Sequence, residues 1–294
     1  MDVTSALQRS ANYTTKNARA SRQIFESGIV VFRNNAQYKL GDDSWQFLDS
    51  LALAAIDVGR IDVAQDCFIR LSAEFPESPR VQCLEGILKE AREGPEAALN
   101  FYDQLLEADP TNTAVWKRLI SVLRRLGRIE RAVEELSKLA DTFYTDVEVW
   151  LELADIYATH HQYTSALRSL SHVLLLTPQN PFYVLQAAET AYTAQDVPLA
   201  IRFFLMVVEM TGVDSDETRP PPPPTGITVR AWYGVELSAA RLEANPALGS
   251  SSPSKTRVPE HLSQLRQLAR DAINSAQVDR RDAETEASSA WLSR

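Results

Sequence analysis

Five alanines recur along the chain at one fixed interval. Steps of 34 from Ala166 in both directions reach the other four, so the set is Ala64, Ala98, Ala132, Ala166 and Ala200. A small residue held at a fixed period of this length is typical of a structural unit that the chain repeats. This period limits the possible folds more strongly than any feature of the composition.

Other positions keep the same period. An aromatic residue or leucine stands four residues after each alanine: Phe68, Tyr102, Leu136, Leu170 and Phe204. A helix breaker or stop closes four of the five units, and a tyrosine closes the third: Pro76, Pro110, Tyr144, Pro178 and Gly212. An apolar residue stands near the start of four units, and Gln82 is the exception: Leu48, Trp116, Trp150 and Val184.

A unit of this length accommodates two helices of roughly 12–15 residues and two short turns. The alanine lets the second helix approach the first closely, and the larger residue one turn later fills the space beside it. Gly59 and Gly127 mark turns between the two helices. The candidate residues for packing within and between repeats are therefore the five alanines together with Trp116 and Trp150.

This spacing matches that of tetratricopeptide repeats. We predict an all-α fold, a tetratricopeptide-repeat superhelical solenoid with at least five helix-pair repeats of this period plus capping helices. An irregular helical bundle would not keep one register over five copies. The repeats occupy residues 44–213.

The segments that flank the repeats have distinct compositions. We expect a flexible or loosely packed terminus over 1–20, where Arg9, Lys16 and Arg19 would suit a mitochondrial presequence but Asp2 and weak amphipathicity argue against one. Residues 21–43 form an N-terminal capping helix region, with the helix itself at 21–32.

The C-terminal side alternates between loops and helices. A Pro-rich insertion spans 214–228, and its five prolines favour an extended polyproline stretch. We interpret it as an inserted loop; the alternative is a docking ligand for a small recognition domain. The later segments are a sixth-repeat helix (229–244), a low-complexity linker (245–259), a C-terminal capping helix (260–278) and a flexible tail (279–294). In the capping helix Leu262, Leu265, Leu268 and Ile273 are expected on one stripe.

Charge and cysteine content exclude several functional classes. The net charge of −9 argues against nucleic acid, because phosphate binding needs a basic surface. Cys67 and Cys83 are too few for a disulfide framework and are expected to be reduced. MDVTSALQRS lacks the apolar core of a signal peptide, and the most apolar run, 203–208, is too short to span a bilayer. We expect a soluble chain whose membrane contact is indirect.

No motif for catalysis, phosphate binding or metal binding is present. His160 and His161 are adjacent, so on a helix they would point about 100° apart and could not easily share a metal with His172. We interpret them as turn residues. The prediction is therefore no catalytic residue, no metal, no cofactor and no enzymatic activity.

A solenoid of this kind offers a concave groove lined by the first helix of each repeat. One such helix carries polar and basic residues opposite its core-facing stripe: Lys117, Ser121, Arg124, Arg125 and Arg128. This cluster could hold an acidic peptide or a peptide C-terminus. The alternative is a solvated helix face on which arginines pair with neighbouring glutamates.

Tetratricopeptide co-chaperones that grip the C-terminal carboxylate of heat-shock chaperones need Asn beside Lys on the groove helices. Here Ser121 follows Lys117 by one turn, and the groove-facing sides of these first helices contain no Asn. This co-chaperone function is therefore not expected.

Four stretches, taken in order, go beyond the generic repeat: LGDDSW (40–45), AAIDVGRIDVAQDC (54–67), YDQLLEADPTNTAVWKR (102–118) and WLELADIYATHHQYTSAL (150–167). Together they resemble the family of subunit 2 of the endoplasmic reticulum membrane protein complex, over roughly residues 40–240. The resemblance implies a soluble, non-catalytic scaffold on the cytosolic face of that membrane.

In that family the subunit cradles cytosolic segments of membrane-embedded subunits, so that the assembly can insert transmembrane helices, including tail anchors. The resemblance implies Lys117, Arg124 and Arg125 as groove contacts, other subunits of the complex as partners, and no homo-oligomer. The alternative function is a free tetratricopeptide-repeat adaptor that binds peptide segments of partners in another pathway.

Overall fold

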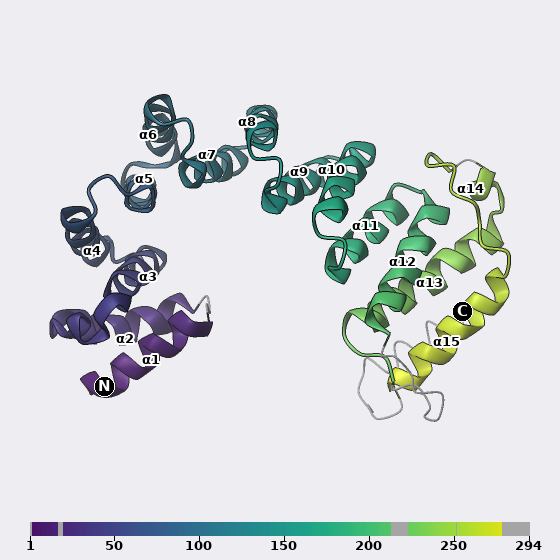
Figure 1. The fold of residues 1–294 in the computed structure, drawn as a ribbon, viewed down its shortest axis with the longest axis horizontal. Helices are drawn as coiled ribbons and strands as arrows, with labels where there is room; N and C mark the ends of the chain where they lie inside the picture. Colours follow the sequence, from purple (N-terminus) through teal and green to yellow (C-terminus); the bar gives the residue numbers. More distant parts are fainter. Residues whose placement is uncertain (1, 17–19, 213–222, 251, 278–294) are drawn as a thin grey trace. The chain divides into compact units, whose positions relative to one another are not determined.

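The computed structural model describes residues 2–16, 20–212, 223–250 and 252–277, and these form helices joined by turns and loops, with no strand among them (Figure 1). The chain divides into two compact units, Met1–Glu135 and Leu136–Arg294. The all-α prediction with paired helices is confirmed.

The first unit begins with two helices and a 3₁₀ segment, after which helical hairpins follow. Its elements are α1 (Val3–Lys16), α2 (Ser21–Arg33), η1 (Ala36–Asp43), α3 (Ser44–Asp57), α4 (Ile61–Glu74), α5 (Pro79–Glu93), α6 (Pro95–Ala108) and α7 (Thr113–Arg125). Helix α8 (Ile129–Thr142) contains the boundary between the units. Within this unit α3 packs on α4 and α5 on α6, and α3, α5 and α7 contact one another in succession.

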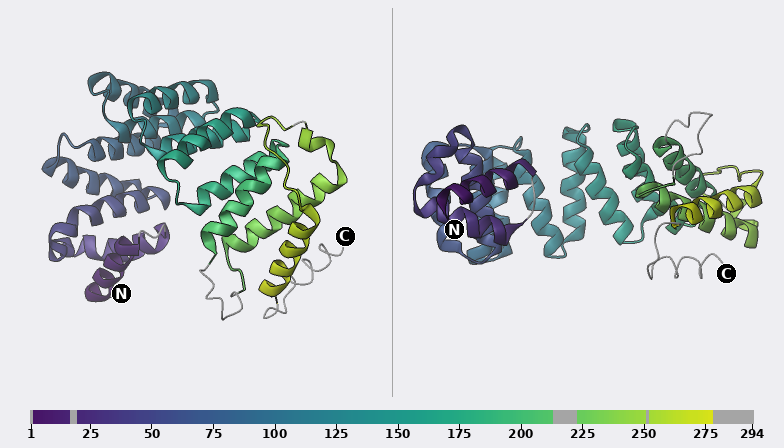
Figure 2. Two further views of the ribbon diagram at one scale, coloured as in Figure 1. Left: turned by 45° about the vertical axis from the view of Figure 1, so that its right-hand side comes forward. Right: turned by 90° about the horizontal axis from the view of Figure 1, so that it is seen from below.

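The second unit continues the hairpins and ends in a layer of two long helices. Its elements are α9 (Val147–Thr159), α10 (Tyr163–Leu176), α11 (Pro181–Thr193), α12 (Val197–Thr211), α13 (Ile227–Ala244), α14 (Ala247–Ser250) and α15 (Leu262–Gln277). Helices α9 and α10 form one hairpin and α11 and α12 the next. Helix α13 packs on α12, and α15 runs alongside α13 (Figure 2).

The alanines that define the repeat all lie at 0% exposure, one on the second helix of each hairpin. Of the residues one turn later, four are buried and Phe68 is partly buried. Close approach of two helices excludes larger side chains at the contact. The repeat period is therefore the spacing of successive helix–helix contacts in the core.

Two glycines show how close the helices come. A Cβ atom added to Gly86 on α5 would lie 2.0 Å from the ring of Tyr102 on α6. A Cβ added to Gly234 on α13 would lie 2.3 Å from the ring of Phe204 on α12. Both rings occupy the position four residues after a repeat alanine, so each aromatic ring packs directly on the backbone of a neighbouring helix.

The two tryptophans near the start of their units are half-buried. Trp116 donates from Nε1 to Glu135 Oε2 at 3.0 Å. Trp150 donates to the carbonyl oxygen of Tyr144 at 3.0 Å and stacks on His172 with ring centroids 4.3 Å apart. Each indole therefore satisfies its N–H group, and Trp150 also stacks its ring on a neighbouring helix.

The prediction of a loosely packed N-terminus is wrong for residues 3–16, which form α1. Ala6 is fully buried, and Val3 and Leu7 pack against the same core. These three residues follow the i, i+3, i+4 spacing of one helical face, which packs against α2 and α3. Residues 17–19 lie outside the described part.

The C-terminal segments also differ from expectation. Helix α13 begins at Ile227, inside the expected insertion, whereas residues 213–222 of that insertion lie outside the described part. The expected linker 245–259 contains the helical turn α14. It is also held by Asp196, which accepts from Ser252 Oγ at 2.7 Å and from the backbone N–H of Ser254 at 3.0 Å. Asp196 is 2% exposed, so this segment is fastened to the turn before α12.

Helix α15 covers α13 with a face that includes Leu262 and Ile273 of the predicted stripe but excludes Leu268. Leu268 is 53% exposed, whereas Ala269 and Ile273 are fully buried. Leu268 lies about 120° from Leu262 around a helix, since six residues turn through about 600°. The buried stripe therefore passes through Ala269. The expected tail, 279–294, lies outside the described residues.

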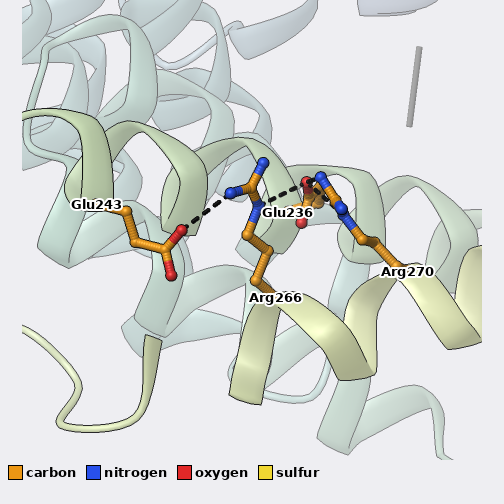
Figure 3. A network of polar contacts seen from close by, with 4 residues as sticks. All are labelled: Glu236, Glu243, Arg266 and Arg270. Atoms are coloured by element: carbon orange, nitrogen blue, oxygen red, sulfur yellow. Dashed lines mark hydrogen bonds and ion pairs between the residues drawn. The ribbon is translucent and has the colours of Figure 1, made fainter. Parts of the chain in front are cut away.

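A buried carboxylate fastens α15 to α13 (Figure 3). Glu236 is 3% exposed, and its Oε1 accepts from Arg266 Nε at 2.9 Å and from Arg270 Nε at 3.0 Å. Arg266 also donates to Glu243 at 2.9 Å. Two arginines on α15 thus share one carboxylate on α13, which offsets the cost of burying that charge.

Candidate interaction groove

An open groove of about 820 Å³ lies within the first unit. It is bounded by α2 and by the first helix of each hairpin, α3, α5 and α7. The lining residues are Ser21, Ile24, Ser50, Leu53, Ala54, Ile56, Asp57, Ile87, Glu90, Ala91, Arg118 and Arg125. On each helix they follow spacings of three, four or seven, so they occupy one face. The face opposite packs on the second helices and forms the core.

The floor of the groove is apolar at its centre. Leu53 on α3 is 39% exposed and is one of the few large apolar side chains of this unit that reach solvent. Ile56 on the same helix and Ile87 on α5 are partly buried beside it. The apolar strip therefore crosses from one first helix to the next. Such a strip can take up apolar side chains of another chain.

One end of the groove carries an ion cluster built from α5 and α7. Glu90 is 8% exposed and accepts from Arg118 Nη2 at 3.0 Å through Oε2, while Oε1 pairs with Arg125. The side chains of Arg118 and Arg125 are 32% and 60% exposed. The two arginines therefore balance the charge of a carboxylate that is nearly enclosed by protein. Arg125, the more exposed of the two, also reaches into solvent.

Burial and neighbouring charges shift the pKa values of Arg118 and of Tyr102, which lies next to this cluster. Burial raises the pKa of the Tyr102 hydroxyl, which lies beside Arg118, and Cys83 acts in the same direction. Burial lowers the pKa of Arg118, but Glu90 and Tyr102 outweigh it and the pKa is raised. Arg118 therefore stays charged, and Tyr102 stays neutral, over the physiological pH range.

The predicted contact residues occupy different environments. Lys117 and Arg124 are half-buried on α7, whereas Ser121, Arg125 and Arg128 are exposed. Of these five, Arg125 lines the groove, and it does so paired with Glu90. Arg125 therefore matches the alternative prediction, in which an arginine of this helix face pairs with a neighbouring glutamate. A groove role for the other four stays a prediction.

Arg118 and Glu90 line the groove but are absent from the predicted contact residues. Arg118 stands seven residues before Arg125, two helical turns away on the same face, so its position was readable from the spacing. Glu90 stands one repeat period before Arg124 and thus at the equivalent repeat position. Nothing local indicated that its carboxylate is buried and shared by two arginines of the following repeat.

No group of three or more His, Cys, Asp or Glu residues in the described ranges is arranged to hold a metal ion. His160 and His161 lie between α9 and α10, and His161 Nδ1 is 2.9 Å from the Tyr163 hydroxyl. Burial raises the pKa of the Cys67 thiol to about 12.

Across the helices that the structure describes, none combines the length and the apolar character needed to cross a bilayer.

Comparison with known proteins identifies the relatives of this chain. The ER membrane protein complex subunit 2-A of Xenopus laevis is 34% identical over 234 residues, which cover 79% of this chain and 74% of that protein. The chain belongs to the ER membrane protein complex subunit 2 family. The resemblance seen in the sequence is thereby confirmed.

Other matches agree with this family. The EMC2 TPR-like repeat domain matches residues 63–203. The TPR repeat protein oca3 of Schizosaccharomyces pombe is 35% identical over 157 residues, covering 52% of this chain and 56% of that protein. Among solved structures, the C-terminal part of a TPR repeat-containing protein from Cytophaga hutchinsonii has a TM-score of 0.55 at 14% identity, with 95% of this chain and 98% of that chain covered. This last match supports the fold alone.

Proposed function

We propose that the chain is a non-catalytic scaffold subunit of the endoplasmic reticulum membrane protein complex. In this proposal it lies on the cytosolic face of the membrane and cradles cytosolic segments of membrane-embedded subunits. The assembly then inserts transmembrane helices, including those of tail-anchored proteins. The observation that carries the proposal is the 34% identity to subunit 2 of Xenopus laevis over most of both chains.

The groove supplies a physical means for this role. The groove has a volume of about 820 Å³ and spans four helices, with an apolar floor and a charged end. Rigid helical hairpins hold these side chains in place before any partner arrives, so little ordering free energy is lost on binding. A scaffold needs such a surface and no reacting group.

Co-purification tests the assembly. The full chain, tagged and purified in mild detergent, is expected to recover the same set of transmembrane proteins in stoichiometric amounts. An isolated soluble pool without membrane partners would support the free-adaptor alternative instead.

On sealed microsomes, added protease should digest the chain without detergent if it lies on the cytosolic face.

A pair of variants tests the groove. Leu53→Asp combined with Ile87→Asp places two charges on the apolar floor and should reduce recovery of the membrane proteins at least several-fold. A single-charge control, Leu175→Asp, changes a side chain that is 79% exposed and lies outside this groove. Full recovery with the double variant would show that partners bind elsewhere.

In cells depleted of the chain, insertion of a tail-anchored reporter should fall and be restored by the unaltered protein.

A further inference from the structure

The two ends of the groove differ in charge. At the α2–α3 end, Ser21 donates from its hydroxyl to the carboxylate of Asp57. At the α7 end, Arg118 and Arg125 share Glu90. Between them lies the apolar strip formed by Leu53, Ile56 and Ile87. A bound segment therefore meets an anionic end, an apolar centre and a cationic end in order.

The cationic end retains positive charge and donor capacity after its internal pairing. Two guanidinium groups face one carboxylate, which leaves one positive charge in excess. Each guanidinium has five N–H donors, and the single carboxylate of Glu90 occupies only some of them. With a side chain that is 60% exposed, Arg125 can bind a second carboxylate while Arg118 holds Glu90.

Glu90 itself is a poor docking point for a basic segment. Its side chain is only 5% exposed, and both oxygens already accept from arginine. A lysine of a partner would have to displace a charged donor and then approach the remaining arginine. The charge arrangement thus favours an acidic occupant over a basic one.

We infer that the groove recognises an extended segment of a partner subunit in which an Asp or Glu stands about three residues from an apolar side chain, in either chain direction. The apolar side chain packs on Leu53 and Ile87, and the carboxylate binds Arg125. Helices α5 and α7 are in contact, and packed helices lie about 8–10 Å apart. An extended chain advances about 3.3 Å per residue, so the two side chains stand about three residues apart. This inference rests on the proposed scaffold function and adds the chemistry of the recognised segment.

Synthetic peptides test the inference on the full chain. The probes are overlapping 15-residue peptides that tile the extramembrane segments of the co-purifying subunits. The best-binding acidic peptide is compared with its carboxylate-to-amide version, on the unaltered protein and on Arg125→Gln. We expect the unaltered protein to prefer the carboxylate about five-fold, and the preference to vanish in Arg125→Gln and to weaken with salt.

A matched control separates the site from general charge. Arg92 on α5 is exposed and donates to Gln65 on α4, away from the groove, so Arg92→Gln makes the same change in net charge. The carboxylate preference should persist in this variant. Circular dichroism checks that Arg125→Gln folds; the peptide comparison on the unaltered protein tests the inference even if it does not.

Several results would overturn the inference. Equal binding of acid and amide peptides would remove the role of charge, and preference for a lysine version would reverse it. A preference that survives in Arg125→Gln would place the carboxylate elsewhere. Binding of no peptide would exclude a linear segment in the groove. The scaffold proposal is judged separately by co-purification, so its failure is recognisable on its own.

Discussion

At the residue scale, the turn between the two helices of a hairpin depends on one backbone conformation. Gly59, Gly127, His161 and Gln195 have φ values of 80°, 72°, 59° and 64°. The last three stand one repeat period apart, whereas Gly59 and Gly127 are separated by two periods, with one further turn between them. There the positive φ moves by one residue, to Gly94. The left-handed region is accessible to glycine but costs other residues about 1–2 kcal/mol. His161 and Gln195 therefore hold a conformation that the surrounding hairpins impose.

Exchanging residues at these turns should change stability in opposite directions. Gln195→Gly is expected to raise the free energy of unfolding by about 0.5–1 kcal/mol, because relief of the left-handed strain exceeds the added entropy of the unfolded chain. Gly59→Ala is expected to lower it by about 1 kcal/mol, although nothing lies within 4 Å of the added Cβ. Urea denaturation measures both changes. The same sign for the two variants would contradict this explanation.

At the scale of helices, the contact of α5 with α6 illustrates how the aromatic residue of the repeat is used. Tyr102 is fully buried, and its ring lies against the backbone of Gly86. An alanine at position 86 has no room unless the helices separate or the ring moves. The pairing of a small residue with a large one across the hairpin thus sets the distance between the two helices.

Gly86→Ala should therefore destabilise the protein, by about 1–3 kcal/mol through overpacking. Helix propensity alone predicts the opposite sign, since alanine in a helix interior is favoured over glycine by about 1 kcal/mol. Combining Gly86→Ala with Tyr102→Leu should give less than the sum of the two single effects, because the smaller side chain makes room. Chemical denaturation of the four proteins measures this coupling, and simple additivity would show that the contact is unimportant.

Helices at the ends of the repeats show the limits of pattern reading. Helix α1 packs three small or medium apolar residues, so its buried face gave too weak a signal against a polar, basic background. In α15 the leucines predicted one stripe, but the ion cluster around Glu236 fixes how the helix is rotated on α13. The buried stripe follows Ala269 and Ile273, and Leu268 is left in solvent.

At the scale of the whole molecule, contacts are mainly between elements that are near in sequence, and they group into two units. In repeat proteins stability is approximately a sum of repeat terms and nearest-neighbour terms. A local defect should therefore lower protection near its site and have a smaller effect several repeats away.

Hydrogen exchange of Ala64→Leu tests this locality. Ala64 is fully buried on α4, and a leucine there should cost about 1–3 kcal/mol. Amides of α3, α4 and α5 should exchange faster, whereas those of α11, α12 and α13 should keep their protection. Ala73→Leu, at an exposed position of the same helix, is the control and should change neither set. Uniform loss of protection in Ala64→Leu would indicate that the chain unfolds as one cooperative unit.

The sequence by itself determined the helix pairs, the burial of the five alanines and the family. These follow from short-range periodicity and from residue order, because a helix repeats its faces every few residues and the hairpins recur at one fixed period. The tertiary structure decided the left-handed backbone of His161 and Gln195, the packing of α1, the rotation of α15 and the sharing of Glu90 by Arg118 and Arg125. Each of these depends on how one helix sits against another. Glu90 and Arg125 belong to successive repeats, and only the packing of α5 on α7 brings a carboxylate and a guanidinium together.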